Sequence, residues 1–339
     1  MNRKIKIYIS HGSLSGVLFL LIIFSLNTRF SEAQDPYFSQ VNSNILYTNP
    51  AFAGVQAQSN LSLAYRNQWP GKSTKFETFY ASYDQPIEVL HGGIGLVAMN
   101  DRSGSVLNMV HLSIIYAYNL QISNTLFMQA GFQVSANQRN IRTDGLIFPD
   151  MISPALGIFR ETNESLTNSQ KFYMDYSAGF IAYSGEWFGG FAIHHLTKPA
   201  ISESERDEFQ LSRKFGFHLT RNLLLNERSR REDSWIISPG IQYFNQKPFS
   251  YFNIGFILSK SPVSMGIQLH NDFQFDSSFL SFSLGFSNPL VKFSYSYDVL
   301  LSNSSLYKTP GGTHELNVVI RLKEFSKTRL VRTIKLPAN

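Results

Sequence analysis

The chain has 339 residues, of which 16% are charged and 14% aromatic, and its formal net charge is +6. It contains no cysteine, which excludes a disulfide scaffold, a thiolate metal site, a catalytic thiol and a lipoprotein anchor, because each of these needs a thiol. The mean hydropathy of −0.12 excludes a helical membrane bundle, and the low charge indicates apolar residues interleaved with small polar ones.

The first 33 residues have the pattern of a secretory signal peptide. Three cations lie within residues 3–6, a mostly apolar stretch covers 14–26, and the small residues Ser31 and Ala33 precede a cleavage site. The apolar stretch is shorter than the roughly 20 residues of a membrane-spanning helix, so we expect cleavage before Gln34. Cleavage removes four cations and one anion, which lowers the net charge from +6 to +3, and nucleic-acid binding is therefore a poor inference.

Residues 34–57 precede the first expected strand and are rich in Asn, Gln, Tyr and Pro. Asn49-Pro50 favours a turn, because the residue before a proline is pushed out of the helical region. Unpaired backbone groups in lipid cost several kcal/mol each, so this segment must face water or a polar lumen. We expect either a plug in the lumen or a strap at the periplasmic mouth.

Between residues 58 and 322 apolar and small polar residues alternate with a period of two, as in Leu280–Ser287. Because successive side chains of a strand point to opposite faces, each run predicts a strand with one apolar and one polar face. Most runs have about 8–12 residues, close to the length that crosses a bilayer as a tilted strand. We therefore predict an all-β fold, an antiparallel transmembrane β-barrel of about 14 strands. The runs are 58–66, 74–83, 92–100, 108–118, 125–138, 172–183, 187–195, 213–221, 234–244, 249–258, 263–270, 279–288, 290–298 and 313–322.

The connections between these runs alternate in length. The long ones, 139–171, 196–212 and 299–312, follow odd-numbered strands, and turns as short as 184–186 follow even-numbered ones. Long external loops and short periplasmic turns are the pattern of outer-membrane barrels. The connection 222–233 is the exception, because it is long and follows an even strand; either the strands are miscounted there or it meets a periplasmic partner.

A soluble β-sandwich would also show many alternating strands. Three features favour the barrel: a polar face of mostly Ser, Gly, Gln and Asn, aromatic residues near the strand ends, and a strand number that is large for one sandwich. The basic tail 323–339 extends beyond the last expected strand and is assigned no role.

Two adjacent pairs of residues carry side chains that often bind metals or catalyse reactions. His194 and His195 lie next to each other on an expected strand and so point to opposite faces, which argues against a shared metal ion. The same geometry separates His314 from Glu315, and a catalytic dyad would need a nucleophile in register. We expect no catalytic residue, no metal and no cofactor.

Several short motifs occur in a characteristic order. The segment after the expected cleavage site reads Gln34-Asp35-Pro36-Tyr37-Phe38-Ser39-Gln40, and Asn49-Pro50-Ala51-Phe52-Ala53-Gly54 follows. Tyr65-Arg66-Asn67-Gln68-Trp69-Pro70-Gly71 ends the first expected strand, and Gly311-Gly312-Thr313-His314-Glu315-Leu316 begins the last. In order and spacing these motifs resemble the PorP/SprF family of the type IX secretion and gliding machinery, over essentially the whole chain after residue 33.

The resemblance implies a non-catalytic outer-membrane β-barrel component of that machinery. Such a protein supports export or surface anchoring of a secreted adhesin or another substrate with a C-terminal domain, and it works with periplasmic components. It also implies the lipopolysaccharide-bearing outer membrane as its location. The alternatives are an outer-membrane pore or substrate-binding barrel and, third, a lipolytic barrel enzyme.

The motif residues are candidates for docking a partner. For Arg66 and Trp69 the alternative is an arginine reaching into the lumen beside an interfacial tryptophan and a Pro-Gly turn. The expected docking residues are Asp35, Pro36, Phe38, Ser39, Gln40, Asn49, Pro50, Gly54, Arg66, Trp69, His314 and Glu315.

Overall fold

The structure is a computed structural model. The expected signal peptide 1–33 and the basic tail 323–339 lie outside the described residues, as do parts of the long connections. No helix formed by the described residues has the length and apolar character needed to span a membrane. The described residues are 35–56, 58–70, 76–142, 149–153, 157–158, 169–201, 210–225, 234–272, 278–301 and 312–322.

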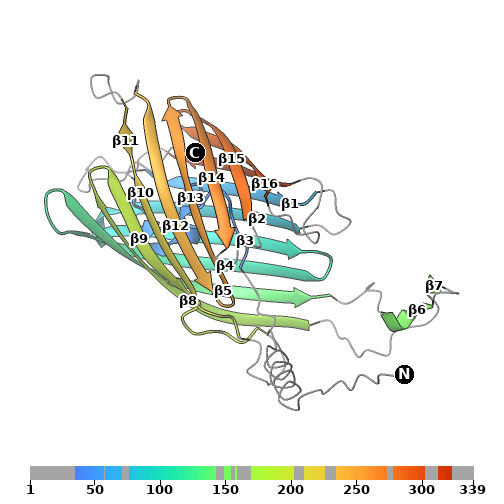
Figure 1. The fold of residues 1–339 in the computed structure, drawn as a ribbon. Coiled ribbons are helices and arrows are strands. Elements are labelled where there is room, and N and C mark those ends of the chain that lie inside the picture. The colour runs from blue at the N-terminus through green and yellow to red at the C-terminus, as the bar shows by residue number, and fades with distance from the viewer. Residues whose placement is uncertain are drawn as a thin grey trace, which may run out of the picture. The chain divides into compact units, whose positions relative to one another are not determined.

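The strands form one antiparallel sheet that closes on itself (Figure 1), with β1 paired to β17. β10 and β11 are two parts of one strand, because both pair with β12 and only Asn222 separates them. The register places Ser238 opposite Asn222 and Pro239 opposite Arg221, and Pro239 has no N–H to offer the ladder. The described residues therefore form a 14-stranded barrel, and the predicted fold is confirmed. The strands are β1 (Asn60–Gln68), β2 (Phe76–Ile87), β3 (Gly92–Ser103), β4 (Leu107–Gln121), β5 (Leu126–Ile141), β8 (Ser169–Ser184), β9 (Trp187–His194), β10 (Lys214–Arg221), β11 (Leu223–Leu224), β12 (Ile236–Gln246), β13 (Phe249–Lys260), β14 (Val263–Asp272), β15 (Ser278–Ser287), β16 (Val291–Leu300) and β17 (Thr313–Arg321).

The alternation in the sequence sorts side chains between the lumen and the outer surface. On β15, Ser281 and Ser283 are buried inside the barrel, whereas Phe282 and Leu284 between and after them are 43% and 62% exposed. An exposed apolar face has no favourable contact with water, but it matches the hydrocarbon of a bilayer. The sheet is therefore apolar outside and mostly polar inside, the reverse of a soluble protein.

The antiparallel order gives the barrel two distinct mouths. The connections that begin at residues 142, 195 and 301 all leave from one end, which we call the long-connection mouth. The turns 88–91, here the 3-10 helix η2 (Glu88–Leu90), and 185–186 leave from the other end, the short-turn mouth. By the general pattern of outer-membrane barrels the long-connection mouth faces the cell exterior.

The exceptional connection near residues 222–233 leaves from the short-turn mouth, because β11 and β12 are the eighth and ninth barrel strands. The strands were therefore not miscounted there. Residues 226–233 lie outside the described part of this connection. The connection after β5 holds η3 (Pro149–Met151) and a separate two-stranded sheet, β6 (Ile152–Ser153) and β7 (Gly157–Ile158).

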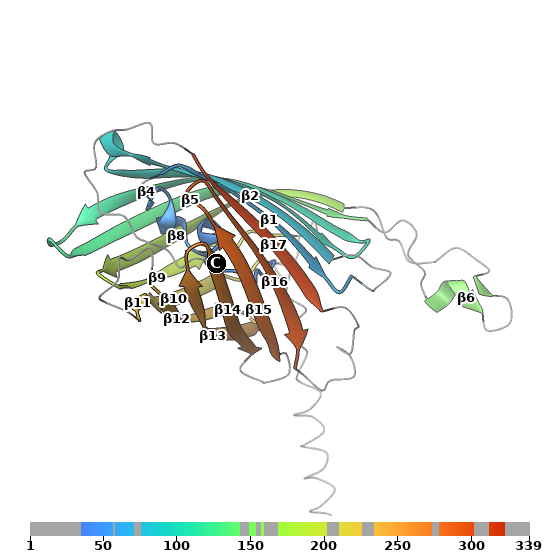
Figure 2. The same ribbon diagram turned by 90° about the horizontal axis from the view of Figure 1, so that it is seen from above.

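Residues 35–56 form a compact segment that we call the lumenal plug. It contains one short helix, α2 (Ile45–Thr48), and a 3-10 turn, η1 (Pro50–Phe52). Figure 2 shows this blue segment enclosed by the ring of strands. Asn49 caps the start of η1, and its side-chain oxygen accepts a hydrogen bond from the N–H of Ala51, which is the local reason that Asn49-Pro50 makes a turn.

A charge on the outer face should destabilise the barrel according to its depth. Ile114 is 67% exposed near the middle of β4, and Ile122 is 50% exposed in the turn that follows. We expect Ile114→Arg to cost about 2–4 kcal/mol of folding free energy in lipid vesicles and Ile122→Arg about 0–1 kcal/mol, because only the first arginine enters hydrocarbon. Urea titration of both variants measures this, and equal costs would contradict the assignment of the outer face to lipid.

Candidate functional site

Apolar side chains of the lumenal plug pack on one half of the barrel wall. Phe38, Leu46, Phe52 and Val55 are each at most 3% exposed and share one buried cluster with wall residues. All wall members of this cluster come from β1 to β9, so the plug is attached by the hydrophobic effect to that half of the lumen. The wall members are Ala64, Tyr80, Val97, Met99, Ile115, Ala117, Phe127, Ile181, Tyr183 and Phe188.

The middle of the plug lies directly on glycines of the wall. A Cβ atom at Gly131 would stand 2.4 Å from the backbone nitrogen of Ala51, and one at Gly179 would stand 1.9 Å from the side-chain oxygen of Asn49. The Asn49 amide also donates hydrogen bonds of 3.2 Å to two backbone carbonyls, those of Phe180 and Phe191. Only glycine permits this approach, because any side chain would collide with the plug.

The end of the plug is held at the short-turn mouth in the same way. Gly54 has a φ of +67°, and its N–H donates a 3.2 Å hydrogen bond to the carboxylate of Asp84. A Cβ at Gly54 would lie 2.6 Å from the Cα of Gly93. Both the conformation and the space therefore require glycine at position 54.

A buried group of three charges, the ionic clamp, holds the first half of the plug. Arg66 of β1 lies 3.1 Å from Asp298 of β16 and 3.0 Å from Glu315 of β17, and all three side chains are at most 6% exposed. The N–H of Ser39 donates to Glu315 at 2.7 Å, and that of Gln40 donates to the same carboxylate at 3.2 Å. Ser39 Oγ also donates to Asp298 at 2.5 Å and accepts from Arg66 at 2.5 Å. The plug thus bonds to three neighbouring strands where the barrel closes.

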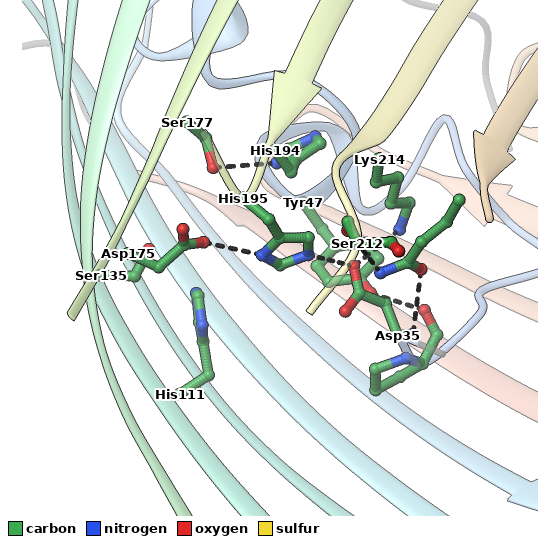
Figure 3. A network of polar contacts seen from close by, with 12 residues as sticks. Asp35, Tyr47, His111, Ser135, Asp175, Ser177, His194, His195, Ser212 and Lys214 are labelled. Carbon is green, nitrogen blue, oxygen red and sulfur yellow. Dashed lines mark hydrogen bonds and ion pairs between the residues drawn. The ribbon is translucent and has the colours of Figure 1, made fainter. Parts of the chain in front are cut away.

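A second charged cluster, the mouth cluster, holds the start of the plug (Figure 3). His195 lies between two carboxylates, 2.9 Å from Asp35 and 2.7 Å from Asp175. Lys214 lies 3.4 Å from Asp35 and 4.8 Å from the centre of the Tyr47 ring. Because His195 follows the last residue of β9 and Lys214 begins β10, this cluster stands at the long-connection mouth.

Asp35 and His195, which both lie outside the strands, stabilise each other's charged forms. Burial alone would lower the pKa of His195, but the charge of Asp35 and the hydrogen bonds to both carboxylates outweigh it and raise the pKa to about 9. Burial alone would raise the pKa of Asp35, but the charges of His195 and Lys214 lower it well below its ordinary value. At neutral pH His195 is therefore an imidazolium whose two N–H groups donate to the two carboxylates.

Comparison with known proteins identifies the family of this plugged barrel. A family model described as "Type IX secretion system membrane protein PorP/SprF" matches residues 30–320. The chain belongs to the PorP/SprF family. A search of curated proteins finds no significant match.

Three solved structures resemble this PorP/SprF protein at low identity. A FadL homologue from Pseudomonas aeruginosa has 10% identity and a TM-score of 0.43, covering 82% of this chain and 94% of that one. The CymD monoaromatic hydrocarbon channel has 13% identity and a TM-score of 0.43, with 82% and 91% covered. The KdgM porin has 8% identity and a TM-score of 0.33, with 77% and 99% covered.

Most of the expected docking residues of this PorP/SprF protein converge on the plug or on its contacts. Five of them, Asp35, Ser39, Gln40, Arg66 and Glu315, belong to the two charged clusters. Phe38, Asn49, Pro50 and Gly54 hold the plug by packing and backbone contact, and the Pro36 carbonyl accepts a 2.5 Å hydrogen bond from the Tyr47 hydroxyl.

Two expected docking residues lie apart from these clusters. Trp69 lies in the connection after β1, at a φ of 57°, with its ring against Phe76. His314 is partly exposed and its ring contacts Tyr295 and Tyr297, whereas Glu315 beside it is buried in the lumen. Adjacent residues of a strand point to opposite faces, so His314 and Glu315 are separated as the sequence predicts.

For His194 and His195 the argument that adjacent residues point to opposite faces does not hold, because they do not lie on one continuous strand. β9 ends at His194, and His195 has a φ of 58°, so its side chain turns back to the lumen instead of the outer face. Its partners are Asp35 and Asp175, which lie 160 and 20 positions away in the sequence. The turn residues Lys198 and Pro199 that follow were the signal for a broken strand.

The chemistry available in the lumen is limited by burial. Ser177 Oγ lies 3.2 Å from His194 Nδ1, a contact that a nucleophile and its base would need, but both side chains are buried beneath the Thr48 carbonyl of the plug. The cavity beside Asp35 has a volume of about 40 Å³, room for very few water molecules. No group of three or more His, Cys, Asp or Glu within the described ranges is arranged to hold a metal ion.

The ionic clamp should dominate the stability of the plugged barrel. We expect Arg66→Met to cost about 3–5 kcal/mol of unfolding free energy, because it leaves two carboxylates buried without their cation. Arg221→Met is the matched control, since the Arg221–Glu186 pair is about 40% exposed on both sides and exposed pairs contribute at most about 1 kcal/mol. Urea-induced unfolding of both variants tests this. Similar losses of unfolding free energy would show that the ionic clamp stabilises the barrel no more than an exposed ion pair does.

Attachment at the mouth cluster should weaken in alkali. A histidine whose pKa is raised on folding from 6.5 to about 9 adds stability that is complete below pH 6.5 and is lost as the pH rises through 9. The depressed pKa of Asp35 adds stability that is lost only in acid, below its ordinary value of 3.8. Proteolysis near residue 35 should therefore accelerate between pH 6.5 and pH 9, and His195→Gln should remove the pH dependence. An unchanged slope in that variant would refute the role of His195.

Proposed function

We propose that this protein is a non-catalytic outer-membrane component of the type IX secretion and gliding machinery that supports export or surface anchoring of a secreted adhesin or another substrate. The observation that carries the proposal is the family match, which covers the plug as well as nearly all of the barrel. Its partners in this role are periplasmic components of the machinery and the substrate itself.

The lumenal plug is the part of the molecule that we assign to docking. Seven of the expected docking residues are buried, so they act by holding the plug in place instead of touching a partner directly. Asp35 and Pro36 are only partly buried at the long-connection mouth. Because that mouth faces the cell exterior, these residues are accessible to the substrate and not to periplasmic components. The buried residues are Phe38, Ser39, Gln40, Asn49, Pro50, Arg66 and Glu315.

The alternative functions have weaker support. A passive pore needs an open lumen, and here the plug packs against the inner wall with cavities of about 40 Å³ and 20 Å³ beside it. A lipolytic barrel needs an accessible nucleophile, and the Ser177–His194 contact lies under the plug. Neither arrangement favours transport or hydrolysis over a role in secretion.

Replacing Asp35, Phe38 and Asn49 together by alanine tests the docking role. We expect a barrel that still assembles, shown by heat-modifiable gel mobility, in cells that lose secretion or gliding and no longer co-purify the partner proteins. The control is Gln56→Ala with Gln58→Ala, just beyond the contacts that hold the plug, which should leave secretion intact. Normal secretion by cells with the triple variant assembled would end the proposal.

A further inference from the structure

The outer face of the barrel is hollowed by an apolar groove that crosses β1 to β5 and β8, strands that lie side by side (Figure 1). The groove has a volume of about 480 Å³, whereas the two cavities in the lumen measure about 40 Å³ and 20 Å³. Sites that hold small molecules usually have volumes of about 300–1,000 Å³. The groove is therefore large enough for a ligand, and it opens on the surface that faces hydrocarbon.

Short side chains on neighbouring strands create this groove. The strand register places Ala81 of β2 beside Ala98 of β3, and Ala136 of β5 follows beyond Leu112 of β4. A methyl group covers little of the backbone beneath it, so the floor of the groove is low at these three alanines. The outward-facing positions next to this line toward the short-turn mouth carry the longer side chains of Tyr83, Leu96, Ile114 and Val134.

Polar residues adjoin the groove on the side of the long-connection mouth. On β3 the outward-facing positions change from Ala98 in the groove to Arg102 within four residues, which is about 13 Å along the strand. The tilt of a barrel strand reduces this to about 10 Å of depth, less than one leaflet of a hydrocarbon core about 30 Å thick. The groove therefore lies in the exterior leaflet. The outward-facing polar residues above it are Asn100, Arg102, Asn108, Gln138 and Asn140.

Two arginines at this polar boundary carry unpaired charges. Arg102 near the end of β3 and Arg142 just after β5 are both exposed, and within the described ranges neither belongs to an ion pair. Arg102 lies 5.9 Å from the centre of the Phe79 ring. Glu77 is opposite Arg102 on β2, where it accepts a 3.0 Å hydrogen bond from the Tyr65 hydroxyl. This rim therefore has two cations against one carboxylate, which favours an anionic ligand.

An apolar groove below unpaired arginines matches a ligand that is both acylated and phosphorylated. An acyl chain removes the apolar walls of the groove from other contacts, and a guanidinium binds phosphate oxygens through paired N–H donors. Anionic phospholipids and lipopolysaccharide share this chemistry. Because the long-connection mouth faces the cell exterior, the lipid that reaches this rim is lipopolysaccharide, whose lipid A part carries acyl chains on phosphorylated sugars.

We propose that this outer groove is a lipopolysaccharide site, in which one acyl chain of lipid A lies over Ala81, Ala98 and Ala136 while Arg102 and Arg142 bind its phosphates. The site holds one lipid in a fixed position, in contrast to the exchanging lipids that cover the rest of the outer face. This inference does not rest on the proposed function, because it needs only the outer face of the barrel and its orientation in the membrane.

Titration of the purified barrel with lipid A tests the charged part of the site. The probe is diphosphorylated lipid A added to the full chain in detergent, and native mass spectrometry counts the molecules bound. We expect Arg102→Gln with Arg142→Gln to weaken binding about tenfold or more, because charge-assisted hydrogen bonds to phosphate are lost. The control is Arg213→Gln, since Arg213 is exposed at the same mouth before β10 and donates to the Leu196 carbonyl at 3.1 Å. It should bind like the unaltered chain.

Filling the groove tests its apolar part. We expect Ala136→Phe to weaken lipid A binding by a similar factor, about tenfold, because the added ring occupies the space of the acyl chain. Ala130→Phe is the matched control: Ala130 is an exposed alanine of the same strand, nearer the short-turn mouth and outside the groove. Both rings point to hydrocarbon, so heat-modifiable gel mobility should show folded barrels in each case.

Three results would overturn the proposal. Equal binding by all variants would show that there is no site, and a loss with the arginine variant alone would show that the groove does not hold the acyl chain. Binding of phosphatidylglycerol as tight as that of lipid A would overturn the assignment to lipopolysaccharide. These measurements use purified protein without a secretion partner, so their outcome is independent of the secretion assays above.

Discussion

A guanidinium removed from water must be paired, and in this barrel Arg66 is paired with two carboxylates on neighbouring strands, Asp298 and Glu315. These three strands are β1, β16 and β17, where the first and last strands of the barrel meet. The same carboxylates accept the N–H and hydroxyl groups of Ser39. One set of charges therefore joins barrel closure to placement of the plug, because each carboxylate contacts both Arg66 of the barrel and Ser39 of the plug.

With Ser39 held at the ionic clamp, the rest of the plug extends from it in two directions. From Ser39 the chain runs across the lumen to Gly54 at the short-turn mouth, and along this path it presents apolar side chains to β1–β9. Wall glycines at positions 131 and 179 bring the backbone close enough for Asn49 to bond two strands at once. In the other direction the chain reaches Asp35, where His195 and Lys214 hold it at the opposite mouth.

This arrangement gives the barrel a lumen that is polar on one half and filled by its own N-terminal segment. Membership of the PorP/SprF family connects that architecture with type IX secretion. Apolar packing on β1–β9 and the buried charges on β1, β16 and β17 together hold the plug in the lumen, because both remove groups of the plug from water.

The sequence alone determined the barrel, its 14 strands and the side of each strand that faces lipid, because period-two alternation is a local property of the chain. It also marked Ser39, Gln40, Arg66 and Glu315 as motif residues. Only the tertiary structure decided that these residues touch, since Ser39 and Glu315 stand 276 positions apart and alternation reports a face but neither depth nor register.

The mouth cluster shows the same limit more sharply. Asp35, Asp175 and Lys214 carry no pattern that relates them, and an unbroken strand through position 195 would place the side chain of His195 on the outer face, whereas β9 ends at His194. A single residue with positive φ reversed its side chain and brought it between two carboxylates. Local sequence determines where strands run, whereas the charges that meet inside a closed barrel are decided by its three-dimensional closure.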